Sequence, residues 1–299
     1  MSAQNLDATP ALATARGRRR PRLSRGWLYV LPAGLWTLLF FLIPLAVMAL
    51  HSLDQRKAGK IQPGPTTANY EKFFEKDYLL GTLVNSLELT GLTVLFSTPL
   101  AFALAAVIAY LVPRRWQIAA LVLAVLPFWT SYIVRSYSWL LLLSERGILN
   151  SLLIDSGLIG EPLTLVNSRL GVLIVMVHYF MMIMTLTIYV NLRQIPANYL
   201  RAARDLGAGR LQILLRVILP LSLPGIMVGV FLTVVFAIGD YVTPQIIGGN
   251  REMVMPQAIM LQIGRLANTP MAAALAFILM LVVALAVVGF RRWIRMQRL

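Results

Sequence analysis

Long apolar runs separated by short polar segments make up most of this chain. Six of the runs contain no Asp, Glu, Lys or Arg, and each approaches or exceeds the roughly 20 residues that a helix needs to cross a bilayer. The pattern predicts an all-α integral membrane protein. Its six transmembrane helices are expected at residues 26–50, 89–113, 116–134, 170–192, 217–239 and 266–290. A soluble protein with apolar core helices is a poor alternative, because it would not need six such runs.

The first apolar run follows the basic segment RGRRRPRLSR and so resembles a secretory signal peptide. Its apolar part is longer than the roughly 7 to 15 residues of a signal peptide, and it lacks a small-residue cleavage site. We therefore expect an uncleaved first helix behind a cytoplasmic tail at residues 1–26. One transmembrane domain is expected over residues 27–299, with its core at residues 83–290.

Composition supports a bilayer location, because 58% of the residues are hydrophobic and only 13% are charged. The net charge of +15 suggests nucleic acid as a partner until the distribution of charge is considered. If the N-terminus is cytoplasmic, most of the 27 basic residues lie on the cytoplasmic side, as the positive-inside rule requires. The sequence thus predicts a multi-pass protein of the cell inner (plasma) membrane with both termini cytoplasmic, and argues against nucleic-acid binding. The chain has no cysteine, which excludes disulfides and thiolate metal sites.

Two polar segments between the apolar runs have helical patterns of their own. The segment NYEKFFEKDY, in the loop after the first run, predicts a short interfacial helix. The segment NYLRAARDLGAGRLQILLRVILP precedes the fifth run; Asn198 is its expected N-cap, and Gly207 with Gly209 is expected to end its first helix before a second amphipathic run. A short polar helix gains little stability alone, so we expect a docking partner or, alternatively, anionic lipid headgroups to hold it on the cytoplasmic surface.

The spacing of small residues in this second segment resembles the EAA loop of ABC importer permeases. The resemblance is carried by Ala202, Ala203, Gly207, Leu219 and Pro220. It implies a type I permease fold in which a cytoplasmic coupling helix, between helices four and five, seats on a separate ATP-hydrolysing subunit. The implied coupling residues are Arg201, Ala202, Ala203, Asp205 and Gly207. Arg201 stands where the family usually has glutamate, and Val217 where it usually has isoleucine; the first departure bears on the polarity of one docking contact.

Two further stretches, LPFWTSYIVRSYSWLLLLSERGILN and GDYVTPQIIGG, are similar to permeases of the spermidine/putrescine type. The matches together run from about residue 83 to residue 265. The resemblance implies half of a translocation path for a small cationic solute, with a polyamine such as spermidine or putrescine as the first candidate. Another small organic solute (amino-acid-like, opine or quaternary amine) remains open. The implied partners are a second permease subunit, a dimer of ATPase subunits, an extracytoplasmic solute-binding protein and membrane lipid.

No phosphate-binding loop of the form G-x-x-x-x-G-K-[ST] occurs in the chain. The only Gly-Lys pair, Gly59 and Lys60, is followed by Ile61. ATP and Mg are therefore expected on a separate ATPase subunit, with no cofactor or metal in this chain. The alternative hypothesis is an ion-driven secondary transporter, which would work without the ATPase. A membrane enzyme is disfavoured because the two histidines, His51 and His178, form no HExxH helix and no acids cluster to hold a metal.

Charged groups at membrane depth are costly and usually face a cavity or a partner. Glu88, expected to open helix two, and Asp240, expected to end helix five, are candidates for contact with a cation. Arg135 is expected instead to pair with an acid or with helix-end carbonyls. Trp129, Tyr132, Ser136 and Trp139 have the spacing of one helical stripe, which predicts either a cation-receiving aromatic wall or an interfacial aromatic belt. The candidate solute path comprises Glu88, Trp129, Tyr132, Trp139, Asp240 and Tyr241.

Overall fold

A computed structural model describes residues 26–249 and 253–296, in two compact units that divide between Met48 and Ala49. The first unit contains α1 (Gly26–Thr37), the π-helical turn η1 (Leu38–Leu42) and the beginning of α2 (Ile43–Ser52). These elements form one apolar helix long enough to cross a membrane, which confirms the first predicted span. The tail predicted at residues 1–26 lies outside the described residues except for Gly26.

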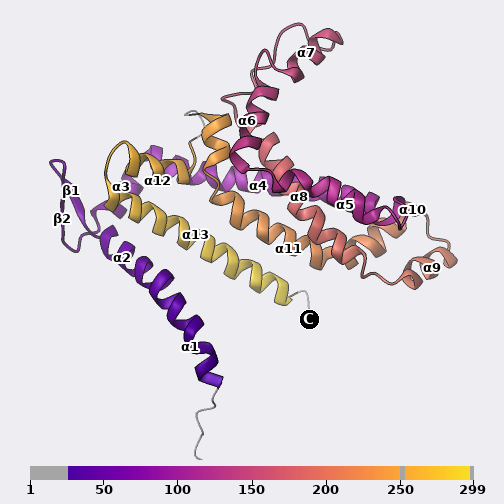
Figure 1. Ribbon diagram of the computed structural model, residues 1–299, viewed down its shortest axis with the longest axis horizontal. Helices are drawn as coiled ribbons and strands as arrows, with labels where there is room; N and C mark the ends of the chain where they lie inside the picture. Colours follow the sequence, from indigo (N-terminus) through magenta and orange to yellow (C-terminus); the bar gives the residue numbers. More distant parts are fainter. Residues whose placement is uncertain (1–25, 250–252, 297–299) are drawn as a thin grey trace, which may run out of the picture. The chain divides into compact units, whose positions relative to one another are not determined.

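The second unit is built on three long helices that pack against one another, α4 (Asp77–Ala106), α8 (Arg169–Leu192) and α11 (Leu219–Ile238) (Figure 1). A fourth long helix, α13 (Thr269–Met296), contacts α11 and the short helices α3 (Ala68–Glu75) and α12 (Met255–Gly264). In the described part of the chain, five helices are long and apolar enough to span a bilayer, or six if a bent pair counts as one span. The all-α fold predicted from the apolar runs is confirmed.

The bent pair replaces the third predicted helix at residues 116–134, which was wrong as a continuous element. The chain forms α5 (Gln117–Val125) and the 3-10 turn η3 (Leu126–Trp129), and then restarts as α6 (Tyr132–Leu143) and α7 (Ile148–Asp155). The two halves meet at an angle of 93°. Pro127 removes a backbone donor at this point, and the extended conformation of Thr130 ends the first half.

The second predicted helix, at residues 89–113, was placed too late, because α4 begins at Asp77. Its first turns contain polar residues that are buried on the helix. Thr82 donates a hydrogen bond to the carbonyl of Leu79 (2.7 Å), and Ser86 donates one to that of Thr82 (3.0 Å). Hydropathy alone predicts a loop at such hydroxyl-bearing residues. Their hydroxyl groups are nevertheless satisfied by hydrogen bonds to the backbone of their own helix. Glu88 therefore lies within α4 and does not open it.

Hydroxyl groups of α4 meet methionine sulfurs of α8 where these two helices pack. Oγ of Ser97 lies 3.2 Å from Sδ of Met184, and Oγ1 of Thr93 lies 4.0 Å from Sδ of Met176. Both methionines are buried, with Met184 at 0% exposure. Flexible thioethers fill irregular gaps well, so α4 and α8 pack closely along this α4–α8 seam.

Helices α8 and α11 approach each other closely at two glycines of α11. A Cβ atom on Gly225 would lie 2.5 Å from Cβ of Asn191 and 2.9 Å from the carbonyl oxygen of Thr187. A Cβ on Gly229 would lie 2.8 Å from Oγ1 of Thr187 and 3.2 Å from Cγ of Met184. Small residues four positions apart let membrane helices come into backbone contact, and this pair uses that geometry.

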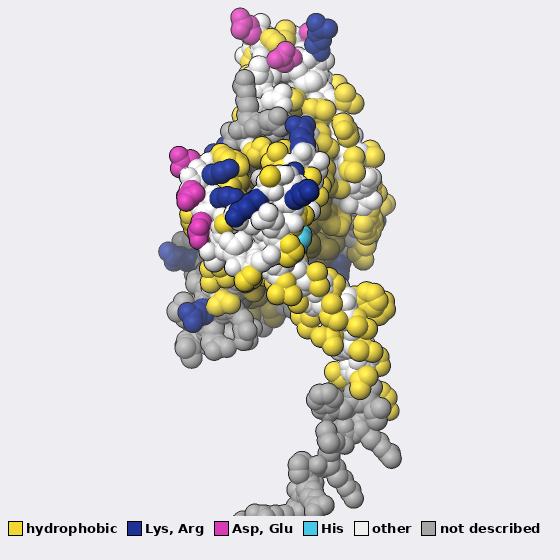
Figure 2. All heavy atoms as spheres, turned by 90° about the vertical axis from the view of Figure 1, so that its left-hand side faces the viewer, with side chains coloured by type: hydrophobic (Ala, Val, Ile, Leu, Met, Phe, Trp, Pro, Cys, Tyr) yellow, Lys and Arg dark blue, Asp and Glu magenta, His cyan; other side chains and the backbone are white. Residues whose placement is uncertain are grey.

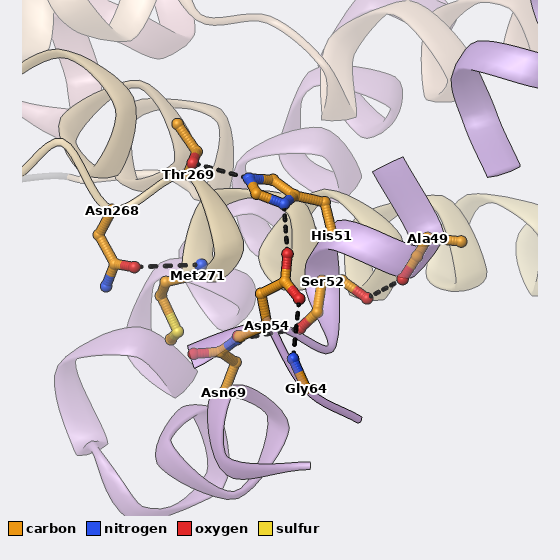
Figure 3. Close-up of polar contacts among 9 residues, drawn as sticks. All are labelled: Ala49, His51, Ser52, Asp54, Gly64, Asn69, Asn268, Thr269 and Met271. Carbon is orange, nitrogen blue, oxygen red and sulfur yellow. Dashed lines mark hydrogen bonds and ion pairs between the residues drawn. The ribbon is translucent and has the colours of Figure 1, made fainter. Parts of the chain in front are cut away.

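One end of the second unit is closed by a polar junction (Figure 3). Nδ1 of His51 lies 2.6 Å from a carboxylate oxygen of Asp54, and its Nε2 lies 3.0 Å from Oγ1 of Thr269, at the start of α13. Asn69 of α3 donates to the carbonyls of Ser52 (2.9 Å) and Asp54 (2.7 Å). The end of α2, α3 and α13 are thereby joined, and α3 confirms the short helix predicted in NYEKFFEKDY.

The antiparallel strands β1 (Gln55–Lys57) and β2 (Lys60–Gln62) project from this junction. In the view toward this end, basic and acidic side chains gather on the face, and hydrophobic side chains cover much of the flanks (Figure 2). Membrane domains typically carry charged side chains on surfaces that face water and apolar ones on surfaces that face hydrocarbon.

The segment predicted to hold the coupling helix forms α9 (Ala197–Asp205). Asn198 is not its N-cap, because the helix already begins at Ala197, after the extended residue Pro196. The second amphipathic run continues into the membrane span: α10 (Arg210–Ile213), the π-helical turn η4 (Leu214–Ile218) and α11 form one helix from Arg210 to Ile238. Gly207 follows the end of α9, as expected, and has a φ of +81°, a backbone conformation that favours glycine.

Candidate functional site

Asp240 lies at the centre of a polar cluster just beyond the end of α11. Its side chain is only 8% exposed. Oδ1 accepts hydrogen bonds from the backbone N–H groups of Val242 (3.0 Å) and Thr243 (3.2 Å), and Oδ2 accepts one from the hydroxyl of Tyr132. The same hydroxyl lies 2.5 Å from Oγ1 of Thr243. The first residue of α6 is thus held against the turn that follows α11.

The guanidinium of Arg135 occupies the aromatic faces beside this cluster. It lies 4.3 Å from the ring centroid of Tyr179 and 5.1 Å from that of Tyr132, and it donates a hydrogen bond to the carbonyl of Pro127 (2.9 Å). Of the two partners expected for Arg135, the structure therefore shows the helix-end carbonyl. The ring of Tyr179 also stacks on that of Phe128, with the two centroids 5.5 Å apart.

In this arrangement one tyrosine contacts both an acid, through its hydroxyl, and a cation, through its ring. Tyr132 donates its hydroxyl proton to Asp240 while its ring faces Arg135. A cation held over an aromatic ring gains about 0.5 to 2 kcal/mol, more when water is excluded. The cluster thus combines a carboxylate with two aromatic rings that already hold a cation.

The predicted stripe of Trp129, Tyr132, Ser136 and Trp139 was wrong as one continuous face. Trp129 ends η3 and is 76% exposed, before the break, whereas Tyr132 begins α6 after it. Trp139 packs edge-on against the ring of His178, with centroids 5.1 Å apart. Tyr241, the neighbour of Asp240, is half-buried. The structure brings Tyr132 and Asp240 together but gives Trp129 and Trp139 other surroundings.

Glu88 has a partner of its own on α8. Its carboxylate forms an ion pair with Arg169, the first residue of that helix. The pair ties α4 to α8, and within the described residues neither of its members forms a hydrogen bond or ion pair with Asp240. Glu88 and Asp240 are thus two separate acidic positions.

The predicted coupling residues lie on different faces of α9. Ala203 and Leu200 pack against the buried cluster that includes Ile188 and Ile213. Arg201, Ala202 and Asp205 are exposed on the remainder of the helix. Leu206, which follows the helix, is 88% exposed. The outward face is therefore Arg201, Ala202, Asp205 and Leu206, while Ala203 seats the helix on its own chain.

Several residues of the site escaped the sequence patterns. Tyr179 and Arg169 belong to α8, which is apolar on all sides, so no helical face singled them out. Thr243 lies inside GDYVTPQIIGG, three positions after Asp240. This closeness in sequence to an acid is the one feature that could have identified it. Among residues 26–249 and 253–296, no group of three or more His, Asp or Glu side chains is placed to hold a metal.

The sequence matches one protein family over nearly its whole length. The family model described as "binding-protein-dependent transport system inner membrane component" matches residues 12–295. The chain is 30% identical over 258 residues to the spermidine/putrescine transport system permease protein PotB of Haemophilus influenzae, covering 86% of this chain and 90% of the relative. It is 31% identical over 248 residues to the inner membrane ABC transporter permease protein YdcU of Escherichia coli, covering 78% and 77% of the two chains.

The fold is similar to that of a solved transporter. It matches a chain of a bacterial alginate ABC transporter in complex with an alginate pentasaccharide-bound periplasmic protein, with a TM-score of 0.74. The match covers 89% of this chain and 93% of the other, at 20% identity. Identity this low shows the fold alone, and it agrees with the fold class predicted from the sequence.

Proposed function

Because the chain belongs to the family of binding-protein-dependent transport system inner membrane components, we propose that it forms half of the path of an ATP-driven importer for a polyamine such as spermidine or putrescine. A second permease subunit supplies the other half. A dimer of ATPase subunits, with ATP and Mg, docks on the outward face of α9, and an extracytoplasmic binding protein delivers the solute. Both termini and α9 lie in the cytoplasm.

The solute class is supported chiefly by the likeness to a spermidine/putrescine permease, which extends over 86% of this chain. The site chemistry is consistent with it. Polyamines are chains of ammonium groups, and the cluster of Asp240 with the rings of Tyr132 and Tyr179 offers a carboxylate and aromatic faces. An ammonium about 4 Å from a carboxylate gains about 4 kcal/mol at an effective dielectric near 20. The net gain must stay modest so that the solute can leave.

Arg135 gives the path a means of release. Its guanidinium already covers the faces of Tyr132 and Tyr179, so an arriving ammonium group competes with a tethered cation. Such competition lowers the affinity for the solute without removing the attraction of Asp240. The solute is then held long enough to pass and not long enough to block the path.

The solute class is tested by uptake in the assembled transporter. The chain would be produced with its partner permease, ATPase and binding protein in proteoliposomes, and labelled spermidine, putrescine, a quaternary amine and an opine would be offered with ATP inside. ATP-dependent accumulation of the two polyamines is expected. Accumulation of the opine or the quaternary amine alone would overturn the assignment.

We expect Asp240→Asn to weaken polyamine uptake by about tenfold, equivalent to about 1.4 kcal/mol. The amide keeps Oδ1 as an acceptor for the N–H groups of Val242 and Thr243, so the turn stays folded while the negative charge is lost. Initial uptake rates at equal membrane content measure the effect. Asp155→Asn removes the same charge from exposed α7 and is the matched control. Equal uptake by both variants would show that Asp240 serves only the turn.

A further inference from the structure

A large cleft lies beside α9, away from the Asp240 cluster. Its volume is about 840 Å³, and it is bounded by the end of α4 with the π-helical turn η2 (Val107–Leu111), by α9, and by α10 with η4. Most of its lining is apolar, including Ala103, Val107 and Leu111. Leu111 is 75% exposed, so the apolar wall continues to the outer surface of the helix.

Two arginines supply the charge of this cleft. Arg204 comes from the last turn of α9, and Arg210 is the first residue of α10. Both are exposed, and no side-chain hydrogen bond or ion pair to either is present among the described residues. The lining contains no acidic residue. The cleft thus combines two uncompensated cations with an apolar trough.

The two apolar walls also share an unusual backbone. The turn η2 and the turn η4 are both π-helical, and both line this cleft. Two further π-helical turns, η1 and Pro244–Gly248, occur elsewhere in the described chain.

We propose that this cleft binds one anionic phospholipid, with its phosphate held by Arg204 and Arg210 and an acyl chain along Ala103, Val107 and Leu111. A diacyl lipid would fill both the basic part of the cleft, at the two arginines, and its apolar part. A free anion would bind only the arginines and leave the apolar part exposed to water. Basic pockets at the cytoplasmic ends of membrane helices suit such headgroups. The lipid assignment rests on the proposed function, which places α9 in the cytoplasm.

The bound lipid would act on the seating of α9. Arg204 and Leu200 face the cleft, and the outward face of Arg201, Ala202 and Asp205 stays free for the ATPase. A lipid bridging Arg204 to Arg210 would join α9 to the start of the long helix that becomes α11. Bilayer composition would therefore affect how firmly the coupling helix is held.

The charge requirement is tested by binding, independently of transport. The full chain would be purified, stripped of lipid and titrated with dioleoyl phosphatidylglycerol or dioleoyl phosphatidylcholine in native mass spectrometry. One tightly bound phosphatidylglycerol is expected, and Arg204→Gln with Arg210→Gln should weaken it by about tenfold or more. Arg114→Gln with Arg115→Gln, which removes the same charge from an exposed turn outside the cleft, should leave it unchanged. Equal weakening in both double variants, or none in the first, would overturn the site.

The apolar requirement separates a lipid from other occupants. Ala103 is exposed in the trough, so Ala103→Trp should reduce phosphatidylglycerol binding while both arginines remain. Glycerophosphoglycerol, the headgroup without chains, should not compete; effective competition would reassign the site to a soluble phosphate. Because the chain has no cysteine, Val107→Cys can carry a single photoreactive label in the assembled transporter. Crosslinking to lipid is expected. Crosslinking to another subunit or to a second copy of this chain would overturn the proposal that the cleft holds a lipid.

Discussion

Gly225→Leu is expected to lower the stability of the folded chain by about 3 kcal/mol or more, because overpacking of a tight interface forces the backbones apart. The added Cβ alone would meet Cβ of Asn191 at 2.5 Å and the carbonyl oxygen of Thr187 at 2.9 Å. Neither is the end of a flexible side chain, so α8 and α11 must separate. The temperature at which the detergent-solubilised chain loses its monodisperse peak measures the effect.

A second glycine provides the matched control for this change. Gly91 lies in α4, and a Cβ there meets no atom within 4 Å. Gly91→Leu adds the same side chain to a membrane helix and should leave the transition temperature within a few degrees of that of the unaltered protein. If the two variants were equally stable, the close approach of α8 and α11 would not contribute to the fold.

Gly207→Val is expected to uncouple ATP hydrolysis from transport while the protein still inserts in the membrane. Gly207 has a φ of +81°, a region that costs a non-glycine residue about 1 to 3 kcal/mol and is worst for β-branched ones. No atom would contact the added Cβ, so the cost arises from the backbone and displaces the end of α9. Polyamine uptake at equal expression should fall at least about tenfold, as expected for a shift of 1.4 kcal/mol or more.

The neighbouring glycine separates backbone strain from the added side chain. Gly209 has a φ of −71° and open space around its Cβ position, so Gly209→Val should retain most of the uptake. Ala203→Asp should resemble Gly207→Val for another reason, since it buries a charge where α9 packs on its own chain. Similar uptake by Gly207→Val and Gly209→Val would show that the positive φ of Gly207 is not needed for coupling.

Hydropathy predicted the helices whose surroundings are uniform. The run at residues 170–192 corresponds closely to α8 (Arg169–Leu192), because that helix is apolar on all sides. Hydropathy predicted helix boundaries wrongly where local hydrogen bonds or a proline decide where a helix begins or ends. Thr82 and Ser86 bond to their own helix and extend α4 toward its N-terminus, and Pro127 with Thr130 breaks the third run, which is apolar on both sides of the break.

The candidate site was predictable in part for a similar reason. Asp240 and Tyr132 stand out as polar groups in apolar surroundings, so each could be selected alone. Their hydrogen bond joins residues that are 108 positions apart and depends on the bend before α6, which no helical spacing encodes. Ala203 shows the converse: its place in a known motif suggested a docking contact, whereas the direction of its side chain follows from how α9 packs.

The α4–α8 seam gives this cysteine-free protein a route to oxidative damage. Met184 is fully buried against Ser97, so peroxide cannot reach its thioether while the two helices stay packed. Sulfoxide formation would add a polar oxygen to a contact that has no room for it. Oxidation of Met184 should therefore track the fraction of time that α4 and α8 spend apart.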